Sequence, residues 1–185
     1  MEPAEKYAVR PVRAEEWEAV RELRLASLRD PVAPIAFLET YEDAVARPDE
    51  FWRERAGRFE LDGSARQFVA EGADGLWWGA VTVRVEGPGE TLMFGDPGEV
   101  RQAHLVGVYV RPGYRGSGVT EALFLAAVEW ARSLAGLERV RLYVHEDNAR
   151  AQGFYRRFGF VRSGESLAVP GDPGKCEYEM VLEGQ

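Results

Sequence analysis

The sequence has few of the features that mark secreted, membrane-spanning or thiolate-metal proteins. Its single cysteine, Cys176, can form neither an internal disulfide nor a thiolate metal site. No stretch approaches the roughly 18 consecutive apolar residues of a membrane span, and the first residues, MEPAEKYAVRP, lack the apolar run of a signal peptide. These absences predict a soluble cytoplasmic protein with no metal and no membrane partner.

Basic residues are also in deficit. The 31 acidic and 23 basic side chains give a formal net charge of -8 at pH 7. Because nucleic-acid binding needs clustered cations, this balance argues against a nucleic-acid partner, whereas a cationic small molecule would meet a mildly favourable field. The length of 185 residues and the hydrophobic content of 45% fit one globular domain, which we expect to span residues 1–185.

Apolar periodicity predicts a mixture of helices and strands. Strands are expected at 7–12, 66–72, 76–87, 103–110, 139–144 and 176–183, and helices at 13–30, 40–57, 120–136 and 148–159. The helical segment from 40 is expected to break at Pro48, to resume with Asp49 as its cap and to stop at Gly57. The glycine- and proline-rich segment 164–175 is expected to be a loop. The strand–helix–strand–helix run after residue 103 predicts two parallel strands.

A glycine-rich turn, RGSGVT at residues 115–120, leads from a strand into a helix in that run. Gly116 and Gly118 remove side chains where a ligand can approach the backbone. Free amides at a helix start, together with the helix dipole, form an anion site suited to phosphate, and Arg115 adds a charged fork. A P-loop is excluded because no Lys follows either glycine, and the dinucleotide fingerprint fails because Glu121 stands where its third glycine belongs.

The turn resembles the pyrophosphate loop of the GNAT superfamily of N-acetyltransferases. That pattern is Arg or Gln, two residues, Gly, one residue, then Gly or Ala, and its positions here are Arg115, Gly118 and Thr120. Thr120 departs from the pattern, although its hydroxyl can itself bond a phosphate or cap the helix.

A second segment, NARAQGFYRRFGF, resembles the later motif of the same superfamily. The matching positions are Asn148, Ala151, Phe154, Tyr155, Gly159 and Phe160. Asn148 is equally suited to cap the helix that it precedes. Two motifs in the correct order, separated by one helix and one strand, make the resemblance specific; it covers residues 103–161 closely and the remainder by the order of its elements.

The resemblance implies an α/β (α+β) fold with a mixed, mostly antiparallel sheet of about six or seven strands, flanked by helices and with two central parallel strands splayed apart. Gly107, inside an apolar strand, fits a bulge at that opening, and acetyl-CoA is the implied co-substrate there. The residues expected to bind it are Val108, Tyr109, Val110, Arg115, Gly116, Ser117, Gly118, Val119, Thr120, Asn148 and Tyr155.

Acetyl transfer from a thioester to an amine needs a neutral amine, a stabilised oxyanion and a proton for the leaving thiolate. Backbone amides near Val108 are expected to stabilise the oxyanion, and the resemblance assigns the general acid to Tyr155. His104 is the first candidate for the general base, with Glu39 and His145 as alternatives. Candidates for the wall of an acceptor site are Phe37, Tyr41 and Trp52.

The reaction so predicted is direct transfer of acetyl to a primary amine of a small molecule or peptide. Two alternatives stay open: a noncatalytic acyl-CoA-binding sensor, and an acyltransferase that uses another acyl donor or an alcohol acceptor. The acceptor also stays open among a protein N-terminus, lysine, an aminoglycoside, a polyamine and an amino acid. Because homodimers are common in the superfamily, the resemblance makes a homodimer an expectation, whereas the residues themselves leave the oligomeric state open.

Overall fold

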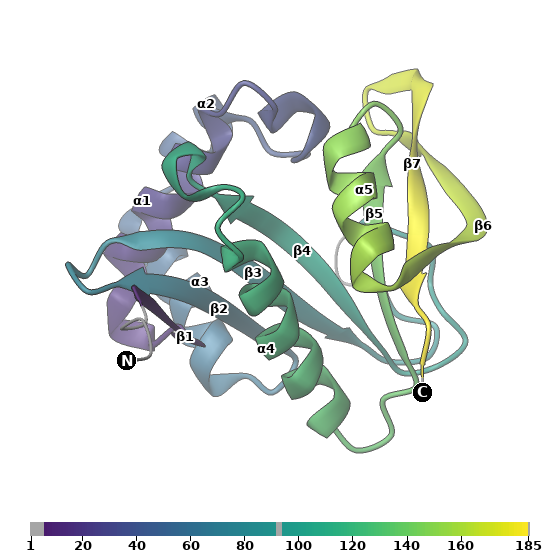
Figure 1. Ribbon diagram of the computed structural model, residues 1–185, viewed down its shortest axis with the longest axis horizontal. Helices are drawn as coiled ribbons and strands as arrows, with labels where there is room; N and C mark the ends of the chain where they lie inside the picture. Colours follow the sequence, from purple (N-terminus) through teal and green to yellow (C-terminus); the bar gives the residue numbers. More distant parts are fainter. Residues whose placement is uncertain (1–5, 92–93, 185) are drawn as a thin grey trace.

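The computed structural model describes residues 6–91 and 94–184 (Figure 1). Within these residues a seven-stranded sheet has the strand order β1-β2-β3-β4-β5-β7-β6. The strands are β1 (Tyr7–Pro11), β2 (Ala65–Gly72), β3 (Trp77–Glu86), β4 (Gln102–Val110), β5 (Arg139–His145), β6 (Phe160–Val169) and β7 (Asp172–Leu182). All neighbours are antiparallel except β4 and β5, which are parallel. The expected mixed, mostly antiparallel sheet is confirmed.

Helices cover both faces of the sheet. They are α1 (Trp17–Leu28), α2 (Tyr41–Val45), α3 (Asp49–Leu61), α4 (Val119–Ser133) and α5 (Ala149–Phe158), with short 3-10 turns η1 (Ala14–Glu16), η2 (Ala33–Ile35) and η3 (Pro112–Tyr114). One core lies under α4 and α5, around Leu123 and Phe124. The other lies under α1 to α3, around Leu23, Trp52 and Phe59. In the part of the chain that the structure describes, no helix has the length and apolar character needed to cross a membrane.

The sheet opens in its middle. β4 and β5 pair over only three positions, Gln102–His104 with Arg139–Arg141. Beyond them the two strands diverge, and Figure 1 shows the V-shaped separation between β4 and β5. β5 continues in antiparallel pairing with β7. The sheet therefore consists of two half-sheets, β1-β2-β3-β4 and β5-β7-β6, which meet at one end of what we call the opening.

Most of the expected elements are confirmed. The segments 66–72 and 76–87 form an antiparallel hairpin, β2 with β3. The run after residue 103 is β4, α4, β5 and α5, in that order. The break at Pro48 also occurs, but Pro48 itself takes the N-cap position of α3, and the helix passes through Gly57 to end at Leu61. A glycine inside a helix costs only about 1 kcal/mol, which the buried face of α3 offsets.

The loop predicted over 164–175 is wrong. β6 and β7 form an antiparallel hairpin across most of it, with Gly171 at its turn in the left-handed region, at φ +81°. β6 is an edge strand whose residues are exposed along most of its length. The apolar alternation by which a strand is recognised is therefore missing from this segment.

Candidate active site

A β-bulge distorts β4 beside the opening. Thr82 pairs with Val106 and Ala80 pairs with Tyr109, so β4 carries one more residue than β3 between these two pairs. Gly107 lies in the left-handed region, at φ +62°, which residues with a side chain rarely adopt. The bulge expected from this glycine is confirmed, and it turns the middle of β4 away from regular pairing.

Beyond His104, the main-chain groups of β4 that face the opening have no pairing with β5 in the part of the chain that the structure describes. Residues 106–108 are half-buried although they lie on a central strand. Because β5 has diverged, the N–H and C=O groups of residues 105–110 on that edge have no strand partner among the described residues. A ligand with amides of its own can pair with such an edge as an added strand would. Val108, Tyr109 and Val110 lie on this edge, as the resemblance implies for residues that bind an extended arm.

The turn before α4 presents a second set of free donors. Gly116 and Gly118 both adopt left-handed conformations, at φ +74° and +86°, and the turn from Gly116 through Ser117 to Gly118 is exposed. No side chain caps the first amides of α4, which begins with Val119 and Thr120. Amides in this position have no intrahelical acceptor and lie at the positive end of the helix dipole. The arrangement is suited to an anion such as a diphosphate.

Arg115 fixes this turn to its surroundings. Its Nε donates to the main-chain oxygen of Val110 at 2.8 Å, and its Nη2 forms an ion pair with Asp30 at 2.5 Å. Within the turn, the Ser117 hydroxyl donates to the main-chain oxygen of Tyr114 at 2.5 Å. Arg115 thus positions the turn against the end of β4, and direct binding of a phosphate by its guanidinium stays a prediction.

Tyr155 lies on α5 and faces α4. Its ring centroid is 5.6 Å from that of Phe124 and 6.1 Å from that of Phe160, and the residue is only 8% exposed. Burial raises the pKa of the Tyr155 hydroxyl well above its ordinary value, and the negative charge of Glu177 raises it further. The phenol is therefore protonated at neutral pH, as a proton donor must be before it acts.

Asn148 caps α5 and also contacts the segment between α1 and α2. Its Oδ1 accepts a hydrogen bond from the main-chain N–H of Ala151 at 3.2 Å, and its Nδ2 donates to the main-chain oxygen of Ile35 at 3.4 Å. Ile35 belongs to the segment between α1 and α2. The helix-capping role is thus observed, while a contact with the cofactor stays a prediction.

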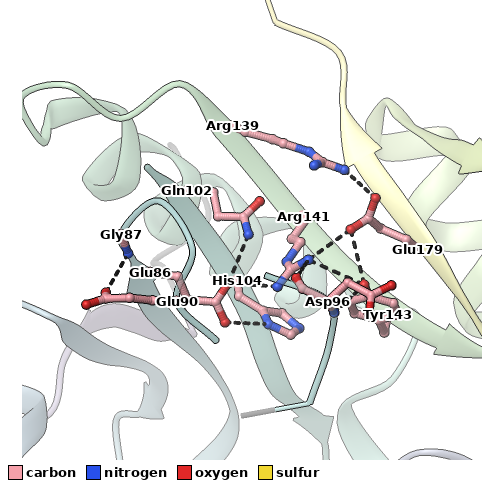
Figure 2. Close-up of polar contacts among 10 residues, drawn as sticks. All are labelled: Glu86, Gly87, Glu90, Asp96, Gln102, His104, Arg139, Arg141, Tyr143 and Glu179. Carbon is pink, nitrogen blue, oxygen red and sulfur yellow. Dashed lines mark hydrogen bonds and ion pairs between the residues drawn. The ribbon is translucent and has the colours of Figure 1, made fainter. Parts of the chain in front are cut away.

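His104 belongs to a buried polar cluster at the junction of the two half-sheets (Figure 2). The cluster, which we call the junction cluster, consists of Glu86, Gln102, His104, Arg139, Arg141, Tyr143 and Glu179. His104 is 2% exposed, and its Nδ1 lies 3.2 Å from Glu86 Oε1. Arg141 donates to Glu86 Oε2 at 2.8 Å and to Glu179 Oε2 at 3.0 Å.

The junction cluster holds the two half-sheets together. Burial by itself would raise the pKa of Glu86, but the hydrogen bonds and charges of His104 and Arg141 outweigh it, and the pKa lies below its ordinary value. The cluster joins β3, β4, β5 and β7 at the three positions where β4 and β5 still pair. His104 therefore has an observed role in holding this junction, and its action as a general base stays a prediction.

Glu177 is a candidate site residue that the sequence patterns did not single out. It pairs with His145 in the ladder between β5 and β7. His145 lies four residues beyond the last β4–β5 pair on its strand, as Val108 does on β4. At a rise of about 3.3 Å per residue, all three positions lie about 13 Å beyond the junction, on opposite sides of the opening. Burial raises the pKa of Glu177 to about 7.

The alternation of β7 shows which way Glu177 points. Tyr178 and Met180 pack into the core under α5, so the side chains of Glu177 and Glu179 lie on the opposite face of the sheet. That face is the one covered by α1 and α3 on the neighbouring half-sheet. The pattern CEYEMVLE carries this alternation, but glutamates at every second position are typical of a solvent-facing strand, so the pattern alone did not mark a site.

The remaining predicted acceptor residues lie near α1. Glu39 forms an ion pair with Arg24 at 2.9 Å, and the guanidinium of Arg24 lies 4.8 Å from the ring centroid of Phe37. Tyr41 packs under another arginine in the same way. Trp52 is fully buried in the core. Glu39 is thus bound in an ion pair with Arg24. Phe37 and Tyr41 lie closer to the surface than Trp52 does.

Two solved structures show that this architecture is a known one. An acetyltransferase of the GNAT family from Streptococcus pneumoniae matches with a TM-score of 0.73 and 18% identity, over 95% of this chain and 98% of that chain. An N-acetyltransferase from Thermoplasma acidophilum in complex with coenzyme A matches with a TM-score of 0.70 and 19% identity, over 96% and 99% of the two chains. At these identities the likeness is one of fold.

Sequence comparison gives the family. The family model described as "Acetyltransferase (GNAT) family" matches residues 17–160, and the chain belongs to this family. A curated relative, a mycothiol acetyltransferase from Salinispora tropica, is 32% identical over 123 residues, which are 66% of this chain and 34% of the relative. The chain thus spans about a third of the length of that relative. Among the described residues, no group of three or more His, Cys, Asp or Glu side chains is arranged to hold a metal ion.

Proposed function

We propose that this protein is an acetyl-CoA-dependent N-acetyltransferase that acts on a primary amine. The opening between β4 and β5 is the observation that carries the proposal, because it joins three features in order. The exposed start of α4 suits a diphosphate, and the edge of β4 without a strand partner suits an arm with amides. Tyr155, which is protonated at neutral pH, is the group that we assign as proton donor to the thiolate. Acetyl-CoA has these three parts in the same order, and membership of the GNAT family supports the same reaction.

The reaction needs one group for each change of charge. The amine nitrogen attacks the carbonyl carbon, and the C=O electron pair moves to oxygen, where the main-chain N–H groups near Val108 stabilise the oxyanion. The oxyanion then collapses, the C–S bond breaks, and Tyr155 donates its proton to the thiolate. The proton lost by the nitrogen restores the tyrosine. The net change converts an ammonium and acetyl-CoA into an amide, free coenzyme A and one proton.

We assign the general base to Glu177 and not to His104, which is buried and bound to Glu86 in the junction cluster. An amine in water is mostly protonated at neutral pH and must lose a proton before it attacks. Because the pKa of Glu177 is raised to about 7, its carboxylate is partly ionised at neutral pH and is a better proton acceptor than an ordinary glutamate. Burial raises the pKa of Tyr155 and the charge of Glu177 raises it further, which supports our assignment of the two residues to one site.

The test combines binding and turnover. Calorimetry should show uptake of acetyl-CoA by the parent protein, and Tyr155→Phe should bind it with a Kd within about twofold but turn over about 100-fold more slowly. Tyr178→Phe is the matched control, since it also removes a tyrosine hydroxyl, from a half-buried residue that packs against the same core. No uptake of acetyl-CoA would refute the proposal. Uptake without turnover on any amine would identify a sensor, and full activity of Tyr155→Phe would remove Tyr155 from the mechanism.

Our proposals on cellular location, domain organisation and oligomeric state rest on the sequence. We place the enzyme in the cytoplasm, as one catalytic domain that acts on a small-molecule or peptide amine. The expected homodimer is tested by sedimentation velocity, which gives the mass of the species in solution with and without coenzyme A. A monomer at micromolar concentration would contradict that expectation and leave the chemistry of the opening unaffected.

A further inference from the structure

A small cavity lies directly beside the bulge, on the face of the sheet covered by α1 and α3. Its volume is about 20 Å³, enough for one small polar group. Arg24 and Ser27 of α1, Arg55 of α3 and Gln67 of β2 contribute its polar lining, and Gly107 of the bulge forms part of its wall on β4. The cavity is therefore a polar site in contact with the strand that is expected to hold the acetyl group.

The charges around this cavity do not balance. Arg24 is neutralised by Glu39, at 2.9 Å. Arg55 forms no ion pair with any described residue. Its guanidinium lies 5.9 Å from the ring centroid of Trp52 and 5.6 Å from that of Phe59, and aromatic faces attract a cation without neutralising it. Arg55 thus has no ion-pair partner of its own among residues 6–91 and 94–184, although the charge of Glu39 also acts on it through space.

Two polar atoms of the lining also lack partners. Arg55 Nε and Gln67 Oε1 have no exposed surface and no hydrogen bond to the described residues. Burial lowers the pKa of Arg55 to about 10, and the positive charge of Arg24 lowers it further. Gln67 Nε2 donates to the Thr82 hydroxyl at 3.0 Å. After rotation of the Gln67 amide, the Thr82 hydroxyl would instead donate to Gln67 Oε1, and the NH₂ group of Gln67 would point to the other side.

An anion would satisfy these groups together. A buried cation without a partner is costly, and a carboxylate oxygen accepts from both guanidinium and amide donors. The free amides that start α4 are the proposed site for the phosphates of the donor, and α4 packs on the opposite face of the sheet. The cavity therefore lies on the face that the acceptor must use. Its position next to Gly107 brings a group bound there close to the bulge.

We propose that the acceptor carries a carboxylate as well as its amine, and that Arg55, assisted by Arg24 and Gln67, binds this carboxylate beside the bulge. Amino acids and peptides with a carboxylate near the reacting amine have this chemistry. The inference rests on the proposed function and narrows its substrate class. The overall charge of -8 favours cations at long range, but the groups that line the site decide which acceptor binds in it.

The first experiment compares acceptors that differ in one charge. The parent enzyme is supplied with acetyl-CoA and the free amino acids, and each acid that reacts is compared with its amide; alanyl-alanine and its amide form the peptide pair, and spermidine is the amine without a carboxylate. The acid should exceed its amide in kcat/KM by about 10- to 100-fold, as expected for loss of a charge-assisted hydrogen bond. Comparison of the free and peptide pairs identifies which source is preferred.

The second experiment tests whether mutation of Arg55 removes the preference for acids over amides. In Arg55→Gln the kcat/KM for the acid should fall until the ratio of acid to amide is about 1, and Arg55→Lys should keep part of the preference. Arg53→Gln is the matched control, because Arg53 lies on the same helix, is exposed, and contacts Glu50 at 4.0 Å and the Trp17 ring but does not line the cavity. The ratio should be unchanged in this control. Calorimetry should give the same acetyl-CoA affinity for all variants.

The outcomes separate this inference from the proposed function. If acetyl-CoA does not bind, both are overturned. If it binds and amides or spermidine react as well as acids, if no carboxylate-bearing amine reacts, or if Arg55→Gln keeps the parent ratio, the inference alone is overturned. If Arg55→Gln does not fold, the inference is tested by the ratio of acid to amide in the parent enzyme and in Arg55→Lys.

Discussion

Replacement of Arg141 by methionine tests what holds the two half-sheets together. Arg141 is 1% exposed and lies 2.8 Å from Glu86 and 3.0 Å from Glu179. Methionine keeps much of the apolar stem but removes the charge, so two buried carboxylates lose their shared cation. Removal of one partner from a buried ion pair costs about 3–5 kcal/mol. Because Glu86 keeps His104, and Glu179 keeps Arg139, we expect a loss near the lower end, about 3 kcal/mol.

The loss should shrink as the solution is acidified. In the parent, the pKa of Glu86 is lowered, so its ionised form contributes stability that is present above the unfolded pKa and is lost as pH falls through the folded pKa. In Arg141→Met, burial dominates and the pKa of Glu86 should rise above its unfolded value. The carboxyl then takes up a proton in the folded state, and the penalty disappears. The gap between parent and variant should therefore narrow from about pH 7 to about pH 4.

Urea unfolding followed by circular dichroism measures both effects. The control is Arg139→Met, since Arg139 is 27% exposed and its partner Glu179 keeps Arg141, so this variant should lose less stability than Arg141→Met. An Arg141→Met variant within about 1 kcal/mol of the parent at neutral pH would refute this role of the junction cluster, given the values typical of a buried pair. A gap that stays constant on acidification would refute the assignment to Glu86.

Three further changes probe the opening and its support. Gly118→Ala forces a side chain into a left-handed conformation at a cost of about 1–2 kcal/mol and should weaken acetyl-CoA binding about tenfold by calorimetry, whereas Gly57→Ala, in open space on α3, should leave it unchanged. Glu177→Gln should lower kcat/KM and abolish its rise with pH near 7, because the group whose carboxylate accepts the proton is gone; an unaltered pH profile would exclude Glu177 as the base. Phe124→Ala should destabilise the fold by about 3–5 kcal/mol in urea, while Leu125→Ala, at a site 57% exposed, should change it by less than about 1 kcal/mol, and equal losses would contradict the packing under α4.

Local patterns predicted the elements that are buried on one face. β4, α4, β5 and α5 carry strong apolar periods and two motifs, so their order and the parallel pair could be predicted. β6 could not, because an exposed edge strand has little apolar alternation and the glycines and prolines of segment 164–175 favour a turn. The end of α3 was missed for the opposite reason: packing of its buried face overrode the local preference of Gly57.

The candidate site divides in the same way. The free donors before α4 follow from Gly116 and Gly118, because a left-handed turn at a helix start is a local property. The junction cluster depends on Glu86, Arg141 and Glu179, which are far apart in the chain and have no common spacing. The unpaired charge of Arg55 likewise arises from three-dimensional packing, since its environment is set by α1, β2 and β4. No single-sequence pattern records such contacts.

The edge of β4 that faces the opening consists of peptide groups, which are chemically the same whatever side chain is attached. Substitutions along residues 105–110 can therefore accumulate without altering the donors and acceptors of that edge, as long as the bulge at Gly107 is kept. The side chains on the acceptor face differ in this respect, because they contact the acceptor directly. Each replacement there changes which acceptor the site binds. A fold built in this way can keep one co-substrate through extensive sequence drift while the second substrate is exchanged.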